Sequence, residues 1–343
     1  NLRQQKYYIF NKSYTKEEYE DKIKSYKLDT YSGVEAFKKE FLDFIKNKPR
    51  KFAECSNIVN STGNYMTNVK NNRYCFHAYD AENNAYCEHV WRGAKDCMDC
   101  STAGRSVELI YNTINVGLQS SNVICSSYCW GSQFMEYCLN CPNSNNCFGC
   151  TGLKKNSYCI LNKQYSKEDY KKLRSEIITK MKQDGNYGDF FPSNMSSFGY
   201  NESSAIEEFT LSKEEALVQG FKWENRERGT YGKETIDWNK FSDSIKDLPN
   251  DFDINKEIFI CLECKKNYRI ITNELSFYRR MNIPLPRNCP ECRHTKRLKN
   301  RGPNKLWHRK CMKEGCNNEF ETSYSPDRPE IIYCEKCYQQ EVY

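Results

Sequence analysis

Short apolar runs and polar turn residues alternate through the middle of the chain at a near-regular step. Between residues 64 and 163 a cysteine repeatedly follows an aromatic, acidic or amide residue, as in Tyr74-Cys75, Tyr86-Cys87, Asp96-Cys97, Tyr128-Cys129, Tyr137-Cys138, Asn146-Cys147 and Tyr158-Cys159. Leaving aside one longer gap, the numbers of successive cysteines rise by 12, 10, 9, 9 and 12. The runs are bounded by Asn, Gly and Ser and are too short for helices, so they predict strands joined by tight corners.

A near-fixed step of this kind is typical of a solenoid, in which each repeat packs on its neighbours. If two steps make one turn of the chain, each coil has roughly 18–24 residues. The sequence therefore predicts a mainly β fold. Its centre, residues 51–183, is expected to be a cysteine-rich, parallel β-helix-like solenoid with helical caps and with inward cysteines stacked in ladders.

A duplicated segment frames this region. Residues 7–19 read YYIFNKSYTKEEY and residues 158–170 read YCILNKQYSKEDY, with identity at eight of 13 aligned positions. In both copies a strand-like run precedes a helix-capping residue, Thr15 or Ser166. The second copy predicts a helix that closes the solenoid. The first predicts the end of an upstream repeat, and hence a chain that is part of a longer protein.

The flanking segments have their own patterns. Apolar residues at helical spacing predict helices over 16–26 and 34–46, within a connector of residues 1–50. Residues 184–256 are acidic and aromatic and predict an arm with one short helix, with Ser212 as N-cap and Gly220 as its stop. We favour an arm whose aromatic residues pack onto a neighbouring surface over a regulatory or partner-binding linker.

Two cysteine pairs near the C-terminus have metal-ligand spacing. Residues 265–288 separate the first pair, Cys261 and Cys264, from the second, Cys289 and Cys292. A CxxC turn brings two thiolates to one tetrahedral zinc ion at about 2.3 Å, and two such turns complete a closed structural site. The pattern therefore predicts a first zinc ribbon over residues 257–302.

The residues around these pairs carry a family resemblance. Residues 258–264 read IFICLEC, residues 273–278 read NELSFY and residues 283–293 read IPLPRNCPECR. The segment 258–299 resembles the probable zinc-ribbon or treble-clef domains of uncharacterised bacterial proteins. The resemblance implies a four-cysteine zinc module and no activity.

A second module follows over residues 303–343. Residues 317–333 separate Cys311 and Cys316 from Cys334 and Cys337, and aromatic residues between the pairs supply a small core. The four-residue gap in the first pair departs from CxxC but remains within zinc-finger practice. The sequence thus predicts two Zn²⁺ ions, one in each ribbon.

The charge is concentrated around these modules. The net charge is +7, yet residues 279–310 contain eleven Lys and Arg and one Glu, a local charge of +10, so the remainder carries −3. Nucleic-acid phosphates are one expected partner of such a segment; an acidic protein surface, this chain's own arm included, is the alternative. The predicted nucleic-acid-binding residues are Arg279, Arg280, Arg287, Arg293, Lys296, Arg297, Lys299 and Arg301, and Trp307 and His308 are candidates for stacking on bases.

The 20 cysteines help to indicate whether the protein is secreted or cytoplasmic. They are disulfides in a secreted protein, or metal ligands and buried thiols in a cytoplasmic one. Zinc-ligand spacing, the absence of a signal-peptide pattern and the lack of a long apolar run favour the cytoplasm and no membrane partner. CxxC also occurs in the solenoid, at residues 97–100, 138–141 and 147–150. There it follows the repeat, which favours packing over a metal array or disulfides.

No catalytic motif accompanies these features, and the chain is predicted not to be an enzyme. None of the four histidines has a neighbouring nucleophile motif, and His77 and His89 sit at matching repeat positions that suit a stacked pair. We expect a non-enzymatic zinc-binding protein whose solenoid scaffold presents basic ribbons to nucleic acid or a nucleoprotein. The alternative is a protein–protein scaffold with purely structural zinc; a solenoid enzyme or a metal-storage protein is the third class.

Overall fold

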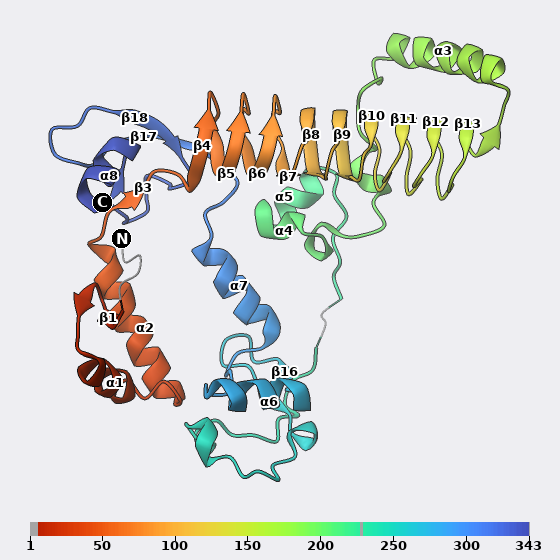
Figure 1. Cartoon of the computed structure of the whole chain (residues 1–343). Coiled ribbons are helices and arrows are strands. Elements are labelled where there is room, and N and C mark those ends of the chain that lie inside the picture. The colour runs from red at the N-terminus through yellow and green to blue at the C-terminus, as the bar shows by residue number, and fades with distance from the viewer. Residues whose placement is uncertain (1–5, 227–228, 343) are drawn as a thin grey trace. The chain divides into compact units, whose positions relative to one another are not determined.

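A computed structural model describes residues 6–226 and 229–342 (Figure 1). The chain divides into two compact units. The solenoid unit comprises residues 51–224 and 303–328, and the second unit comprises the described parts of residues 1–50, 225–302 and 329–343.

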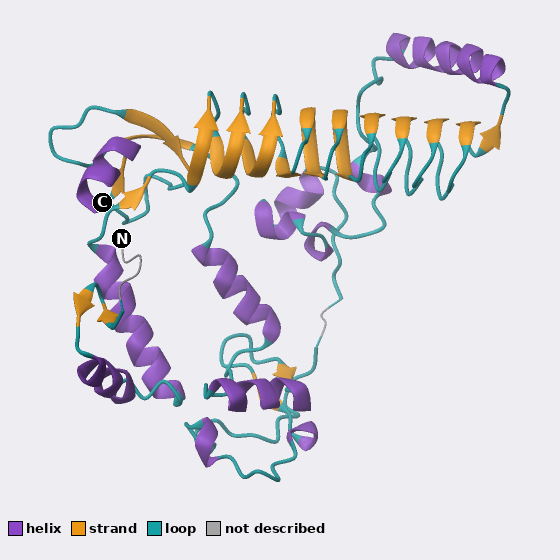
Figure 2. Cartoon of the chain, viewed as in Figure 1, coloured by secondary structure: helices purple, strands orange, loops and turns teal. Residues whose placement is uncertain are grey.

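One sheet of eleven strands forms the solenoid (Figure 2). Neighbouring strands are parallel throughout, apart from the last pair, which is antiparallel. The predicted parallel β-helix is therefore confirmed. In chain order the strands are β4 (Cys55–Val59), β5 (Gly63–Lys70), β6 (Cys75–Glu82), β7 (Glu88–Trp91), β8 (Lys95–Ala103), β9 (Glu108–Val116), β10 (Ser121–Ile124), β11 (Gln133–Glu136), β12 (Asn145–Phe148), β13 (Ser157–Ile160) and β14 (Lys163–Gln164).

Each coil is shorter than the sequence pattern suggested. Strand partners in neighbouring coils include Cys55 with Met66, Gly63 with Cys75, and Lys95 with Glu108. The chain therefore closes a coil at every eleventh to thirteenth residue, and the prediction of roughly 18–24 residues for each coil is wrong. A single cysteine step, and not two, completes a turn of the chain.

The reason is a corner at every third residue. In the coil of β6, the backbone enters the left-handed region at His77, Asp80, Asn83 and Tyr86, with φ between 50° and 58°. The same three-residue rhythm continues through most of the solenoid. Since Asn and Asp tolerate this region better than most residues, the turn formers of the sequence mark the corners of four three-residue sides.

Between the corners, every third side chain faces inward. Cys75, Ala78, Ala81 and Asn84 are all buried, one from each side of a coil. The solenoid core contains eleven of its twelve cysteines, all except Cys125. Stacking of successive coils places these residues in four inward columns, so the predicted cysteine ladders are confirmed.

Ladders of polar and aromatic side chains also follow the corners. Asn60, Asn71 and Asn83 hydrogen-bond in series through their side-chain amides, at 3.1 Å for each step. His77 and His89 stack with ring centroids 4.8 Å apart and planes 9° apart, which confirms the expected pair.

The last coil is closed as the duplicated segment predicted. β14 folds back on β13, and α3 (Lys167–Gln183) begins after its N-cap Ser166. Figure 1 shows α3 alongside the last coils. Tyr170 of α3 packs with Phe148 and Ile160 of the solenoid in one buried cluster.

The first coil is covered by a segment from far along the chain. β17 (Trp307–Lys310) and β18 (Glu319–Thr322) form an antiparallel hairpin. Phe320 packs on Phe52 with ring centroids 5.1 Å apart, and the Thr322 hydroxyl donates to the Phe52 carbonyl. The hairpin thus protects the end of the solenoid that α3 does not reach.

The first half of the predicted arm lies on the solenoid. It contains η1 (Ser193–Met195), η2 (Tyr200–Glu202), α4 (Ala205–Glu208) and α5 (Lys213–Val218). The Ser212–Glu215 capping box is present, and Gly220 follows α5 with φ of 81°, as predicted. Tyr187 and Phe191 contact the ring of Tyr137, so these two aromatic residues serve packing, whereas Phe198 and Phe209 are exposed.

The second unit is mainly helical. Its first elements are β1 (Tyr8–Ile9), β2 (Lys12–Ser13), α1 (Lys16–Ser25), α2 (Tyr31–Lys46) and β3 (Arg50–Lys51), whose last residue belongs to the solenoid unit. The remaining elements are η3 (Ile245–Asp247), η4 (Ile254–Lys256), β15 (Phe259–Ile260), β16 (Asn267–Tyr268), α6 (Thr272–Met281), α7 (Pro290–Asn300), β19 (Ile332–Tyr333) and α8 (Glu335–Val342).

The duplicated sequence forms a duplicated structure. Ile9 pairs with Lys12 in β1–β2, as Ile160 pairs with Lys163 in β13–β14. Both helices of the N-terminal connector are present. α2 begins earlier than expected, at Tyr31, because the Thr30 side chain caps it by accepting the N–H of Gly33. The upstream repeat stays a prediction.

Candidate metal centre

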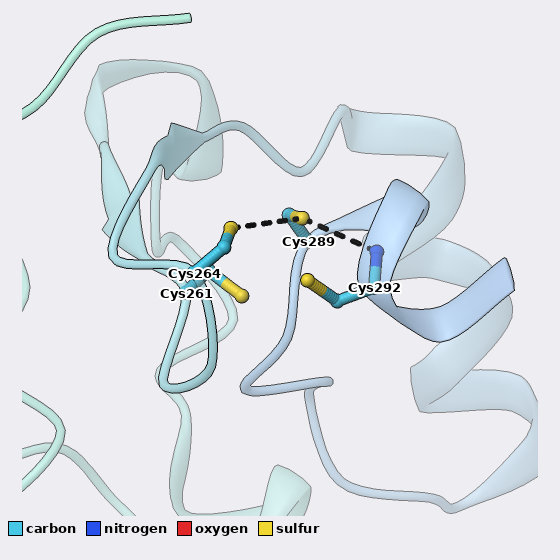
Figure 3. Close-up of side chains that lie close together, drawn as sticks. All are labelled: Cys261, Cys264, Cys289 and Cys292. Carbon is cyan, nitrogen blue, oxygen red and sulfur yellow. Dashed lines mark hydrogen bonds between the residues drawn. The ribbon is translucent and has the colours of Figure 1, made fainter. Parts of the chain in front are cut away.

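The first predicted cysteine set forms one cluster in the second unit (Figure 3). Cys261 and Cys264 lie in the turn between β15 and β16. Cys289 is the N-cap of α7, and Cys292 lies in the first turn of that helix. A hairpin turn and a helix N-terminus, well separated in sequence, therefore supply two ligands each.

The spacing of the sulfur atoms fits a tetrahedral ion. All four Sγ atoms lie within 4.8 Å of one another, and those of Cys264 and Cys289 are 3.8 Å apart. A tetrahedron with metal–sulfur bonds of about 2.3 Å has edges of about 3.8 Å. The four side chains thus have the separation that a zinc ion requires.

The pKa shifts differ among the thiols of this cluster. Burial alone raises the pKa of Cys261, but hydrogen bonds from the backbone of Cys289, Cys264 and Glu263 outweigh it and lower that pKa to about 7. The Cys289 sulfur accepts the N–H of Cys292 at 3.5 Å. Burial nevertheless raises the pKa of Cys289 and that of Cys292, so among these three thiols only Cys261 is shifted toward the thiolate, the form that binds metal.

A compact aromatic core supports this cluster. The Trp238 ring stacks on Phe259 with centroids 5.1 Å apart, and its indole N–H donates to the Ile260 carbonyl at 2.7 Å. Phe241 and Phe252 pack against the same core. The second half of the predicted arm is therefore part of the metal module, and its aromatic residues also serve packing.

The second predicted set also comes together. The Sγ atoms of Cys311, Cys316, Cys334 and Cys337 lie within 4.8 Å of one another. The Cys311 N–H donates to the Asn318 carbonyl at 2.9 Å, which closes the turn after β17. Within residues 6–226 and 229–342 these two sets are the only groups of three or more candidate ligands at this spacing.

The thiols of the solenoid form hydrogen bonds to backbone carbonyls and, among the residues that the structure describes, do not gather in four-sulfur clusters like these two sets. The Cys138 S–H donates to the carbonyl of Glu136 at 3.3 Å and to that of Cys147, one coil further, at 3.4 Å. The inward Ser132 makes the same pair of bonds, to Trp130 and Cys141, at 3.1 and 2.8 Å. Cysteine and serine are thus interchangeable donors to corner carbonyls, and the three-residue spacing of CxxC equals one side of the coil. This pattern favours packing over a metal array.

Three of the predicted nucleic-acid-binding arginines make internal contacts. Arg287 is 15% exposed, pairs with Asp243 at 2.8 Å and lies over the ring of Tyr31 at 4.1 Å. Arg293 donates to the Tyr278 hydroxyl and to Glu274. Arg279 donates to the Pro249 carbonyl. These guanidinium groups hold the module together.

Other predicted cations face solvent. Arg280, Lys296, Arg297 and Lys299 are exposed, and Lys296 pairs with Glu263 at 2.8 Å. Arg301 is half-buried. On the β17–β18 hairpin, both ring nitrogens of His308 face carboxylates, those of Glu321 and Glu319, which raise its pKa. Fewer of the predicted cations are therefore exposed than the sequence alone suggests.

Comparison of the chain with family models, curated proteins and solved structures finds no match. Within the described part of the chain, no helix is both long enough and apolar enough to cross a membrane.

Proposed function

We propose that this chain is a non-enzymatic zinc-binding scaffold. The observation that carries the proposal is the 3.8 Å distance between the sulfurs of Cys264 and Cys289 inside a four-cysteine cluster. Zinc prefers such closed, all-thiolate sites and adds its binding energy to the folding of small modules. Ligand pairs from a hairpin turn and from a helix N-terminus support the resemblance to treble-clef zinc domains.

Metal analysis tests this proposal. The protein purified under reducing conditions should contain two zinc ions per chain by inductively coupled plasma mass spectrometry, one for each cluster. Absence of zinc after reconstitution would overturn the proposal. Many more than two ions would instead support metal storage in the solenoid. Free, buried thiols are stable in a reducing compartment, so we place the protein in the cytoplasm.

The proposed partner is nucleic acid. Four exposed cations, Arg280, Lys296, Arg297 and Lys299, lie on α6 and α7 of the metal module. Each phosphate that a cation neutralises releases condensed counterions, so four contacts give a slope of about −3 to −4 in log K against log salt. Structural zinc sites would hold these helices in place.

Fluorescence anisotropy with mixed-sequence RNA and DNA, at low and physiological salt, tests the partner. We expect binding at low salt that weakens steeply with salt, and a reduced slope after Arg280, Arg297 and Lys299 are changed to Ser. A matched control changes the exposed residues Lys154, Lys155 and Lys172 of the solenoid unit to Ser, with the same loss of charge. Equal weakening by both triple variants would indicate attraction by net charge alone.

A protein–protein scaffold with purely structural zinc is the second candidate. The internal contacts of Arg279, Arg287 and Arg293 favour it, because they remove three cations from the predicted surface. Absence of nucleic-acid binding at low salt, with full zinc content, would leave this candidate as the function.

A further inference from the structure

A pocket of about 300 Å³ lies between α3 and the outer face of the solenoid, entirely within the solenoid unit. It is separate from both cysteine clusters, and neither the zinc sites nor the basic helices use it. Pockets of this size that combine apolar walls with a few polar groups are typical of small-molecule sites. Its principal lining residues are Asn122, Phe134, Glu136, Tyr170, Lys171 and Arg174.

Equivalent positions of successive coils line the solenoid side of this pocket. Asn122, Phe134 and Asn146 occupy the same left-handed corner of three successive coils, with φ of 54°, 53° and 49°. Ile124 and Glu136 follow on the adjoining side. The coil stacking therefore aligns an apolar ring and two amides along one edge.

Helix α3 supplies the other side. Tyr170 and Arg174 are four residues apart and share one helix face, and Lys171 adjoins them. Tyr170 is 3% exposed, so its ring fixes the helix against the solenoid.

An ion pair with a buried carboxylate orients the arginine. The side chain of Glu136 is 4% exposed, and its two oxygens accept from Arg174 Nε and from the Tyr187 hydroxyl. Arg174 engages Glu136 through Nε alone, and its two terminal nitrogens make no hydrogen bond with any other residue that the structure describes. A guanidinium held in this way presents a fixed fork to a second acceptor.

Further donors at the pocket have no partner in the described chain. Neither the Lys171 ammonium nor the Tyr170 hydroxyl forms a hydrogen bond or ion pair with residues 6–226 or 229–342. With Arg174 and Lys171 against Glu136, the pocket carries a net charge of +1. Donors, positive charge and the Phe134 ring together fit a flat molecule that ends in an oxyanion.

We propose that this pocket binds a small molecule with an apolar, planar body and a terminal carboxylate or phosphate. The oxyanion lies between the terminal nitrogens of Arg174 and the ammonium of Lys171, and the body lies against Phe134 and Ile124. The solenoid is then a receptor for a small anion as well as a scaffold.

Isothermal titration calorimetry on the full zinc-loaded chain tests the proposal. The probes are benzoate, phenyl phosphate and the uncharged benzamide, at constant ionic strength. We expect saturable binding of at least one anion and none of benzamide. Tighter binding of benzoate assigns a carboxylate ligand, and tighter binding of phenyl phosphate assigns a phosphate ligand.

Two variants and a control locate the site. Lys171→Ala and Arg174→Lys should each weaken the anion by about tenfold, the value of one charge-assisted hydrogen bond. Arg174→Lys keeps a cation beside Glu136 and thereby limits loss of stability. Lys172→Ala removes an exposed neighbour outside the pocket and should change nothing. Failure of both anions to saturate, equal binding of benzamide, or equal weakening by Lys172→Ala would overturn the proposal.

Discussion

Cysteine shares the inward columns of this solenoid with alanine and with larger apolar residues such as Met66, Ile110 and Met135. The thiol also donates to backbone carbonyls near the corners. Cys87 donates to the carbonyl of Ala85 at 3.1 Å and to that of Cys97 at 3.4 Å. Each of these carbonyls also accepts a backbone N–H, from Asp99 and Ala85, so the thiol is a second donor and adds a weak hydrogen bond to its packing.

The change Cys138→Ala tests this role. It removes one thiol donor, which is shared between two carbonyls, and leaves a small void, so the free energy of unfolding should fall by about 1–3 kcal/mol. Cys138→Ser keeps a donor and should cost less than Cys138→Ala. Urea unfolding followed by circular dichroism measures both. Ser132→Cys, the reverse exchange at an equivalent inward position, is the control and should be tolerated; a serine variant as unstable as the alanine variant would contradict the hydrogen-bond role.

At the scale of elements, α7 carries cluster cysteines and exposed cations in a single short helix. Its first turn carries Cys289 and Cys292 of the metal cluster, and its exposed side carries Arg297 and Lys299. The sulfur ligands and the basic surface therefore depend on the same helix. Loss of the ion should disturb both.

Replacing one ligand tests the cluster. Cys289→Ser removes an N-cap thiolate, so the zinc content should fall from two ions per chain to one, with some loss of helical circular dichroism. Cys125→Ser, at the solenoid cysteine outside the core, should leave the zinc content unchanged. Two ions retained by Cys289→Ser would show that this cluster is not a four-thiolate site.

The arginines of this module should separate by role. Arg287→Ala removes the pair with Asp243 and the contacts with Tyr31 and Trp238, and should cost about 2 kcal/mol or more. Arg297→Ala removes an exposed side chain and should change stability by less than about 0.5 kcal/mol. Chemical denaturation of the zinc-loaded protein measures both. Equal effects would contradict the division into structural and exposed cations.

At the scale of the whole molecule, the solenoid is closed at each end by a different device. The duplicated hairpin and α3 close the last coil, and the β17–β18 hairpin covers the first through Phe320 and Thr322. A solenoid needs such caps because its terminal strands otherwise expose unpaired edges. Here one cap follows the last coil directly in sequence, and the other comes to the first coil from the C-terminal part of the chain.

The buried thiols make the stability of the solenoid depend on pH in the alkaline range. Burial raises the pKa of Cys129 to about 12 and that of Cys125 to about 11, from an ordinary value of 9.0. Because the folded-state pKa values are raised, their contribution to stability is complete below about pH 9 and is lost as the pH rises through 11 and 12.

Urea midpoints at pH 7, 9, 10 and 11 check this expectation. Stability should fall above pH 9, by up to about 1.4 kcal/mol per pH unit for each thiol that titrates. Cys129→Ser, which does not titrate in this range, should show a weaker dependence. A midpoint that stays constant from pH 9 to pH 11 would contradict the proposed burial effect.

The sequence by itself determined the features that depend on neighbouring residues. The cysteine step specified parallel coils, the duplicated segment specified the hairpin and its capped helix, and the paired cysteines specified two four-sulfur clusters. These follow from turn formers, capping residues and ligand spacing, which act over a few positions in the chain.

Only the tertiary structure decided the rest. It set the length of the coil, because the corner at every third residue depends on contacts with the coils above and below. It brought Phe320 to Phe52, Asp243 to Arg287 and α3 to the pocket at Glu136. Such contacts join segments far apart in sequence through burial and charge, and a local pattern does not encode which distant surface a side chain will meet.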